Sequence, residues 1–519
     1  MATNYYIGIG GTGARVAESL LHTCAAGYGP ESLTLFLIDP DEGNGNLSRT
    51  KELLTRYQST RELLRGRADL DVPLFRTEIR APEPLVWSIF ESGDTTLASY
   101  INHANFKESD PGLYDLVNVL FTRGELKENL NEGFRGHPAI GAVVMAEPPE
   151  GREPWRTFWA DVDAAQRENE IRVFLAGSIF GGTGAAGVPT LGAPDMLKFH
   201  PRARIDGDRS KITLGGVLVL PYFSVDASQA PADGRLFVSS RDFPIATRAA
   251  LRFYSEKDLA FDQLYLAGDS LAQSVGDFSA GSSQQENRPH YVELVSALAA
   301  EDFYLQPEGD VASDRYHIAG RRGDALGWNE LPVTRELGAV AARSAELKRR
   351  LVTMTTFAYA FLDYGFPVLQ QDPKRVRAAW HGDHFDPRRS RKDPTKDPRQ
   401  PNQVAVLTAL RDYCERYLRW IASLDEGPDG AVKLVRRDRL FGQGGFIGHA
   451  RDLSAIGTFL HGPSQERDFN HFRNLLDAPI ELSDRLPPAA KYATLFYDAA
   501  ERFAEDTYGL VPETAAASA

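Results

Sequence analysis

Two short glycine clusters carry the residue types that bind anions without a charged side chain. Each cluster is a run of glycines around one threonine: Gly10, Gly11, Thr12 and Gly13 in the first, and Gly181, Gly182, Thr183 and Gly184 in the second. Glycine leaves backbone N–H groups uncovered and lets a phosphate approach them closely. A helix that begins at such a turn adds the partial positive charge of its N-terminus. Each cluster therefore predicts a phosphate-binding turn.

The segments on either side of the clusters fit this chemistry. Apolar runs precede the clusters and predict buried strands, and segments of apolar spacing follow them and predict helices. These are the strands 5–9 and 171–176 and the helices 14–25 and 185–197. On the first helix we expect Arg15 and Glu18 to face outward.

The rest of the first 310 residues continues the alternation of strand and helix. Further strands are predicted at 33–38, 216–223 and 261–269, and further helices at 246–257 and 292–303. This order predicts an α/β fold with a Rossmann-like parallel sheet. The helix 292–303 follows the last of these strands.

The first cluster alone permits a second interpretation. Its turn fits GxGGxG, a variant of the dinucleotide-binding fingerprint, and Asp39 follows the next predicted strand where a ribose-binding acid is expected. An NAD-binding Rossmann enzyme would use this turn and leave the second cluster without a function. For the second cluster, glycines that only let a helix pack closely on a strand are the structural alternative.

Several segments, in order along the chain, resemble the nucleotide-binding loops of the tubulin/FtsZ superfamily. The second cluster is similar to the GGGTG signature loop, with Phe180 in place of its first glycine and the last glycine displaced to Gly187. The other matching segments are the turn 8–13, the Asn- and Asp-containing segment 36–47, RGHPAIG at 135–141, GVLVLPYF at 216–223 and FDQLYLAGD at 261–269. The resemblance covers about residues 1–310 and is to a prokaryotic tubulin-like protein.

The resemblance implies a GTP or GDP ligand with Mg²⁺ bridging its phosphate oxygens. The phosphates would lie against the two glycine clusters. Residues of other loops would complete the site: Asp39, Asn44 and Asn46 near the phosphates and metal, Gly136, His137 and Pro138 over the terminal phosphate, Asp226 at the ribose, and Asn287 and Tyr291 at the guanine. Two of these have simpler alternatives, because Asn287 could cap the next helix and Asp226 could cap a turn.

The resemblance also implies that the helix 292–303 is the central helix of this superfamily. Hydrolysis in the superfamily takes place in trans, when an Asn- and Asp-rich loop after the central helix reaches the nucleotide of the next subunit. The pattern NxDxxD expected of that loop is not found in this sequence. The nearest residues are Asn329 and Glu330, just before a predicted helix at 333–362, and they are the catalytic candidates. A helix cap would explain both residues equally simply.

Composition restricts the class of protein. The 519 residues carry a net charge of -13, which argues against a general binder of nucleic acid or anionic membranes. The two cysteines, Cys24 and Cys414, suit a reducing cytoplasm, and a cytoplasmic location is expected. No apolar run of about 18 residues is available to cross a bilayer.

The sequence divides into three parts. Residues 1–310 form the predicted GTP-binding domain, with the central helix at its end, and 311–512 form a divergent, mostly helical C-terminal domain. The second part contains an exposed loop at 372–402, whose basic stretch 388–399 could meet nucleic acid or an acidic partner. Residues 513–519 are predicted to be a disordered tail.

Three functions remain open from the sequence. The first is a tubulin/FtsZ-like GTPase that associates with itself head to tail into nucleotide-dependent filaments. The second is a nucleotide-binding switch or scaffold that does not polymerise and recruits another protein. The third is the NAD-binding enzyme.

Overall fold

The structure of the chain is a computed structural model. It describes residues 3–66, 70–88, 95–132, 134, 137–146, 148–165, 171–207, 209–224, 243–269, 273–274, 287–306, 316–319, 339–372, 376, 378–385, 397–424, 434–442, 445–446, 469–483 and 485–510.

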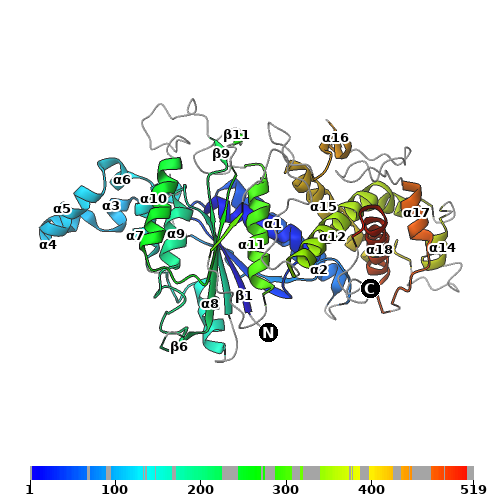
Figure 1. Ribbon diagram of the computed structural model, residues 1–519, viewed down its shortest axis with the longest axis horizontal. Coiled ribbons are helices and arrows are strands. Elements are labelled where there is room, and N and C mark those ends of the chain that lie inside the picture. The colour runs from blue at the N-terminus through cyan, green and yellow to red at the C-terminus, as the bar shows by residue number, and fades with distance from the viewer. Residues whose placement is uncertain are drawn as a thin grey trace.

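An eight-stranded sheet forms the centre of the molecule (Figure 1). Its strands lie in the order β12-β10-β8-β5-β1-β2-β3, β4 also pairs with β2, and every one of these pairings is parallel. The strands are β1 Thr3–Ile9, β2 Ser32–Ile38, β3 Glu78–Arg80, β4 Val86–Trp87, β5 Ile171–Ser178, β8 Ile212–Val219, β10 Gln263–Ala267 and β12 Tyr316–Ala319. The chain builds outward from β1 in one direction, then crosses to β5 and builds outward in the other. This is a Rossmann-like order, so the predicted fold class is confirmed.

Helices cover both faces of the sheet, which is why all eight residues of β5 are buried. Successive residues of each strand point to opposite faces: Tyr6 and Phe174 belong to one core cluster, and Ile7 and Leu175 to the other. The first face is covered by α1 Gly10–Ala25, α2 Gly45–Arg65 and α11 Tyr291–Tyr304. The second face is covered by α7 Pro138–Met145, α8 Trp155–Ala164, α9 Thr183–Leu191 and α10 Phe243–Glu256. Figure 1 shows these two layers on either side of the sheet.

The C-terminal helices form a further layer outside the helices of the first face, where α15 and α18 contact α2, and they belong to the same core cluster. They are α12 Ala339–Ala360, α13 Phe366–Leu369, α14 Ala379–His384, α15 Pro401–Ser423, α16 Arg437–Leu440, α17 Phe469–Asp477 and α18 Pro488–Tyr508. Tyr413 on α15 donates a hydrogen bond to the carbonyl of Leu21 on α1, at 3.2 Å. The described C-terminal residues are mostly helical, as predicted. The sheet nevertheless extends past residue 310, because β12 is its edge strand.

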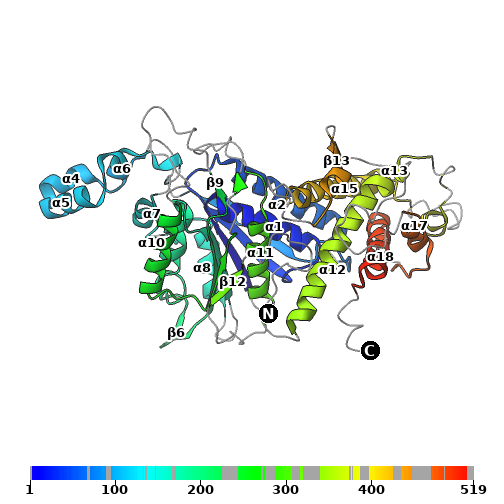
Figure 2. The same cartoon turned by 45° about the horizontal axis from the view of Figure 1, so that its top comes forward.

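Four short helices project from the sheet as an arm, which stands clear of the body in Figures 1 and 2. They are α3 Leu97–Tyr100, α4 His103–Ser109, α5 Pro111–Leu120 and α6 Arg123–Lys127. On α5, Leu116, Val119 and Leu120 are 51%, 81% and 62% exposed. Their i, i+3, i+4 spacing puts them on one side of the helix, so the arm presents an apolar face to solvent.

None of the described helices is both long enough and apolar enough to span a membrane.

Candidate functional site

The two glycine clusters meet at the point where the strand order reverses. β1 and β5 are adjacent parallel strands, so their carboxyl ends lie at the same edge of the sheet. The turn 10–13 follows β1 and the turn 181–184 follows β5. In open parallel sheets, ligands bind at this switch point, because the chains leaving neighbouring strands diverge there.

The first turn brings an uncapped helix end to this edge. Gly10 has a φ of +72°, which an L side chain rarely adopts, and it lets β1 pass directly into α1. Ile9 occupies the N-cap position and provides no side-chain hydrogen bond, and the first turn of α1 carries no acid. The first N–H groups of α1 are therefore available to a ligand.

The second turn supplies a matching helix end. Gly182 is the N-cap residue of α9, again without a side-chain cap and without an acid in the first turn. A Cβ placed on Gly10 would lie 3.3 Å from Cβ of Thr183 and 3.5 Å from the backbone nitrogen of Gly184. The two turns are thus in direct contact, and two helix N-termini converge on one place. Such a pair concentrates partial positive charge where an anion would bind.

The loop after β2 reaches the same place. A Cβ on Gly11 would lie 3.5 Å from Nδ2 of both Asn44 and Asn46. Asn44 is the N-cap residue of α2, and its side chain accepts a 2.9 Å hydrogen bond from the backbone N–H of Asn46. The structure therefore brings together the two glycine turns and the loop 39–46, and we call this set the switch-point site.

Two acids follow β2 in this loop and are the nearest candidates for a metal. Asp39 and Asp41 are 4% and 8% exposed, and the Asp41 N–H donates to Oδ1 of Asp39 at 3.0 Å. Burial raises the pKa of Asp39 to about 8, and the charge of Asp41 adds to the shift. The part of the chain that the structure describes contains no group of three His, Cys, Asp or Glu side chains that could hold a metal ion. The donor set fits a magnesium ion bound largely by phosphate oxygens, since Mg²⁺ commonly takes only one or two protein carboxylates.

Asn287 joins this loop to the start of α11. The Asn287 N–H donates to Oδ1 of Asn46 at 2.9 Å, and Nδ2 of Asn46 donates to Oδ1 of Asn287 at 3.1 Å. Asn287 does not cap the helix, because the N-cap residue is His290, in a capping box with Glu293. Tyr291 is only 2% exposed and packs in the core beneath the first face.

A buried ionic cluster beside the site was missed by the sequence analysis. Arg15 and Glu18 were expected to face outward, and this is wrong, because they are 2% and 5% exposed. Nε of Arg15 lies 2.9 Å from Oε1 of Glu293, and the Tyr222 hydroxyl donates to the same oxygen at 2.6 Å. Burial raises the pKa of Glu293, and the positive charge of Arg15 opposes that rise.

The burial of Arg15 and Glu18 has a simple cause. α11 and α2 pack along the two sides of α1 that single-helix periodicity assigns to solvent. Glu18 is paired there with Arg49 of α2, whose Nε donates to Oε2 of Glu18 at 2.9 Å. The local pattern held one signal: apart from Arg15 and Glu18, α1 contains no Lys, Arg, Asp or Glu, and a helix with so few charges is commonly buried all round.

His137 and Pro138 lie at the start of α7, across from the second glycine turn. Nδ1 of His137 is 2.9 Å from Oε1 of Glu125, and His137 is half-buried. Pro138, Phe180 and Gly181 line one apolar groove of about 620 Å³ between α7, α9 and α10. The start of α7 and the second glycine turn therefore border a common space.

Phe180, which replaces the first glycine of the signature loop, turns away into an aromatic cluster. It is 5% exposed, and its ring centroid lies 4.7 Å from that of Phe243 and 5.4 Å from that of Phe223. The substitution therefore anchors the loop through its side chain and leaves the turn 181–184 as bare backbone.

Four predicted site residues lie outside the described residues: Gly136, Asp226, Asn329 and Glu330. The same holds for 388–396, most of the predicted basic stretch, and for the predicted tail 513–519.

Comparisons with known proteins match no family model and no curated protein. Among solved structures, the chain is similar to CetZ2 from Haloferax volcanii, described as a GTPγS-bound protofilament. The sequence identity is 12%, the match covers 59% of this chain and 60% of that chain, and the TM-score is 0.26. The chain thus matches about three fifths of the length of that structure. At this level of similarity no family is assigned, and the case for function depends on the site itself.

Proposed function

We propose that the switch-point site binds a guanine nucleotide through its phosphates, and that the chain is a tubulin/FtsZ-like GTP-binding protein. One observation carries the proposal: two uncapped helix N-termini meet across β1 and β5, with the Cβ position of Gly10 3.3 Å from Thr183. Their N–H groups would hold two adjacent phosphates of the ligand. We propose guanine as the base because the order of the loops along the sequence resembles that of the tubulin/FtsZ superfamily.

The surrounding residues have matching roles in this proposal. Mg²⁺, when bound, would neutralise charge on the phosphates, and Asp39 and Asp41 are the carboxylates placed to assist. Asn46 and Asn287 hold the loop after β2 against the start of α11, where the base would lie. Asn329 and Glu330 stay the candidates for hydrolysis in trans.

The contact between the turns favours this function over an NAD-binding enzyme. A dinucleotide fingerprint needs only the turn after β1, with the pyrophosphate on α1. Here α9 offers a second free helix end in contact with the first. A ligand with a compact polyphosphate uses both ends, which supports a nucleoside triphosphate.

Self-association head to tail is part of the proposal. A heterologous contact that does not close produces filaments. The apolar residues Leu116, Val119 and Leu120 on the projecting arm offer a surface for a second copy of the chain. A switch or scaffold that binds nucleotide without assembling is the alternative within the same fold.

Titration of the purified protein with GTPγS and with NAD, each with Mg²⁺, separates the candidates. The proposal predicts saturable binding of GTPγS and no binding of NAD at the same concentrations. Binding of NAD alone would assign the site to the dinucleotide class. Light scattering recorded with GTP then distinguishes the filament former, which scatters above a threshold concentration, from the switch, which does not.

A further inference from the structure

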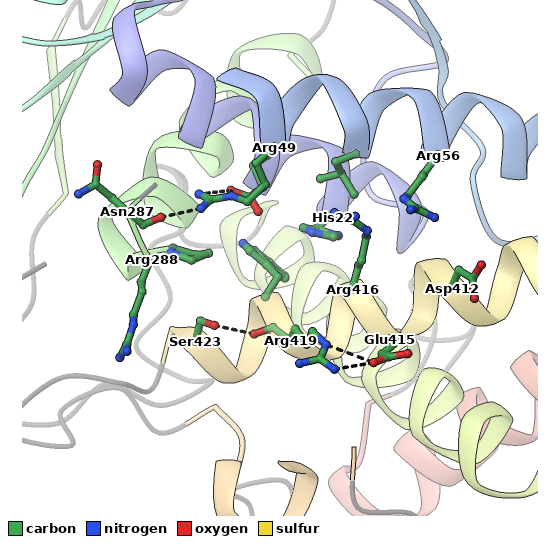
Figure 3. Close-up of a pocket in the computed structure, with 14 residues that line it drawn as sticks. His22, Arg49, Arg56, Asn287, Arg288, Asp412, Glu415, Arg416, Arg419 and Ser423 are labelled. Atoms are coloured by element: carbon green, nitrogen blue, oxygen red, sulfur yellow. Dashed lines mark hydrogen bonds and ion pairs between the residues drawn. The ribbon is translucent and has the colours of Figure 1, made fainter. Parts of the chain in front are cut away.

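A second cavity lies where α15 crosses α2, away from the sheet (Figure 3). Its volume is about 620 Å³, which is within the range of small-molecule sites. Four segments distant in sequence line it: α1, α2, the residues just before α11, and α15. We call it the α2–α15 cavity.

The lining of the α2–α15 cavity is rich in positive charge. Five of its residues are arginines: Arg49, Arg56, Arg288, Arg416 and Arg419. Three carboxylates, of Glu18, Asp412 and Glu415, lie among them. This surplus of positive charge occurs in a chain whose net charge is -13, so it is local to the cavity. Arginine is the side chain best shaped for bidentate contacts with phosphate oxygens.

The arginines on α15 form exposed ion pairs that a ligand can displace. Arg419 pairs with Glu415 at 2.6 Å, and their side chains are 53% and 40% exposed. Arg416 pairs with Glu52 across the junction with α2, and that carboxylate is 49% exposed. Exposed pairs of this kind contribute little to stability, so a doubly charged anion competes well for the guanidinium groups.

Trp420 on α15 also lines the cavity, but its indole nitrogen is buried. Trp420 is 3% exposed and stacks on His22 with ring centroids 4.6 Å apart. Within the described part of the chain, Nε1 of Trp420 finds no hydrogen-bond partner. Because this nitrogen is itself buried, it offers no donor to the cavity. Burial and the charges of Arg416 and Arg49 lower the pKa of His22 to about 3, so the imidazole stays neutral beside this surplus of positive charge.

We propose that the α2–α15 cavity binds a small molecule carrying a phosphate or pyrophosphate group. Arg288, Arg416 and Arg419 bind its oxygens. The cavity is separate from the switch-point site but adjoins it. Asn287, which lines the cavity, contacts Asn46 of that site, and Nη1 of Arg49 donates to the Asn287 carbonyl at 2.7 Å. The ligand therefore lies beside the segment that ties α11 to the loop after β2.

Calorimetric titration with sodium pyrophosphate tests the proposal on the full chain. The variant is the double substitution Arg416→Gln and Arg419→Gln, and its matched control is Arg252→Gln, an exposed arginine on α10 with a similar i, i+4 carboxylate pair. We expect the double variant to weaken pyrophosphate binding by about tenfold or more, because two charge-assisted contacts are lost, and the control to leave it unchanged. Equal affinity in all three proteins, or binding too weak to saturate, would mean an adventitious ion only and overturns the proposal.

Two further measurements keep this site distinct from the switch-point site. Repeating the titration with GTPγS present fills the glycine turns, and pyrophosphate binding should persist. If GTPγS does not bind at all, the proposed function fails while the comparison of arginine variants still decides the cavity. Trp420→Phe keeps the ring on His22 and removes only the buried N–H, so we expect pyrophosphate affinity to be unchanged. A loss of affinity in that variant as large as in the double arginine variant would contradict binding through the arginines.

Discussion

Arg15 shows how a single residue couples three segments around the switch-point site. It lies on α1 two residues after the first glycine turn, contacts Tyr222 just beyond the end of β8, and pairs with Glu293 on α11. All three side chains are buried. A buried pair contributes little relative to an apolar replacement, but removing one partner leaves the other charge uncompensated.

Arg15→Ala should therefore destabilise the folded protein. We expect the free energy of unfolding to fall by about 3–5 kcal/mol, because Glu293 would be left without its cation. Urea denaturation measures this. The control is Arg80→Ala, which breaks an exposed pair with Glu78 and should change stability by no more than about 1 kcal/mol. Equal effects of the two substitutions would show that Arg15 is not buried as described.

Glu301 on α11 predicts a pH dependence of stability. Burial raises the pKa of Glu301 to about 8, while hydrogen bonds from Thr23 and Cys24 oppose the shift. A carboxyl whose pKa is raised on folding stabilises the protein at low pH, and this contribution is lost as pH rises toward 8, because the unfolded chain ionises first. Glu301→Gln should flatten the fall in unfolding free energy between pH 5 and pH 8, by at most about 1.4 kcal/mol per pH unit.

Urea denaturation at several pH values checks this prediction. Glu52→Gln is the control, because the hydrogen bond from Arg56 lowers the pKa of Glu52 and places its titration below this range. A slope that Glu301→Gln leaves unchanged would contradict the burial of an ionisable Glu301.

At the scale of elements, the packing of α7 on α9 fixes where His137 and Pro138 stand relative to the second glycine turn. A Cβ on Gly141 would lie 2.5 Å from Cβ of Ala186 and 2.7 Å from Cδ2 of Phe134, so the helices meet there without space for a methyl group. Gly141→Ala should lower the free energy of unfolding by about 1–3 kcal/mol through overpacking. Gly151→Ala is the control, since nothing lies within 4 Å of its Cβ position. Equal stability of both variants in thermal or urea unfolding would contradict this close contact.

The order of elements was predictable from the sequence because it depends on local patterns. The apolar runs before the glycine clusters form β1 and β5, and the helix predicted at 292–303 is α11 Tyr291–Tyr304. The contacts between elements were not predictable in the same way. Arg15 and Glu18 are buried by α11 and α2. Because α11 is distant in sequence and α2 follows only after β2, the residues near α1 could not indicate these contacts.

The arm was not predicted for a related reason. Residues 113–121 are mostly apolar, and this composition alone does not indicate that they lie outside the body. The structure places them at α5 of the arm, with Val119 81% exposed. Of the candidate site, the glycine turns, Asn44, Asn46 and Asn287 came together as a group. The sequence predicts that these residues lie together only through the rule that the carboxyl ends of parallel strands meet at one edge of a sheet.

At the scale of the whole molecule, the exposed apolar face of α5 predicts self-association. Val119→Asp places a charge in that face, and we expect the threshold protein concentration for light scattering with GTP to rise about tenfold, a loss of about 1.4 kcal/mol per contact. Asn118→Asp on the same helix adds the same charge without removing apolar area and should change the threshold little. A threshold that Val119→Asp leaves unmoved would place the contact elsewhere on the molecule.

We propose that the two touching glycine turns form the nucleotide site. A matched pair of alanine substitutions tests this assignment most directly. Gly10→Ala puts a methyl group at a φ of +72° against Thr183, whereas Gly207→Ala imposes the same kind of strain at a φ of +50° with nothing within 4 Å. Titration of both variants and of the unmodified protein with GTPγS and Mg²⁺ gives the three affinities. We predict a loss of about tenfold or more for Gly10→Ala, because the strained turn displaces its N–H groups, and no change for Gly207→Ala. Unchanged GTPγS affinity in a folded Gly10→Ala protein would contradict the assignment of the site.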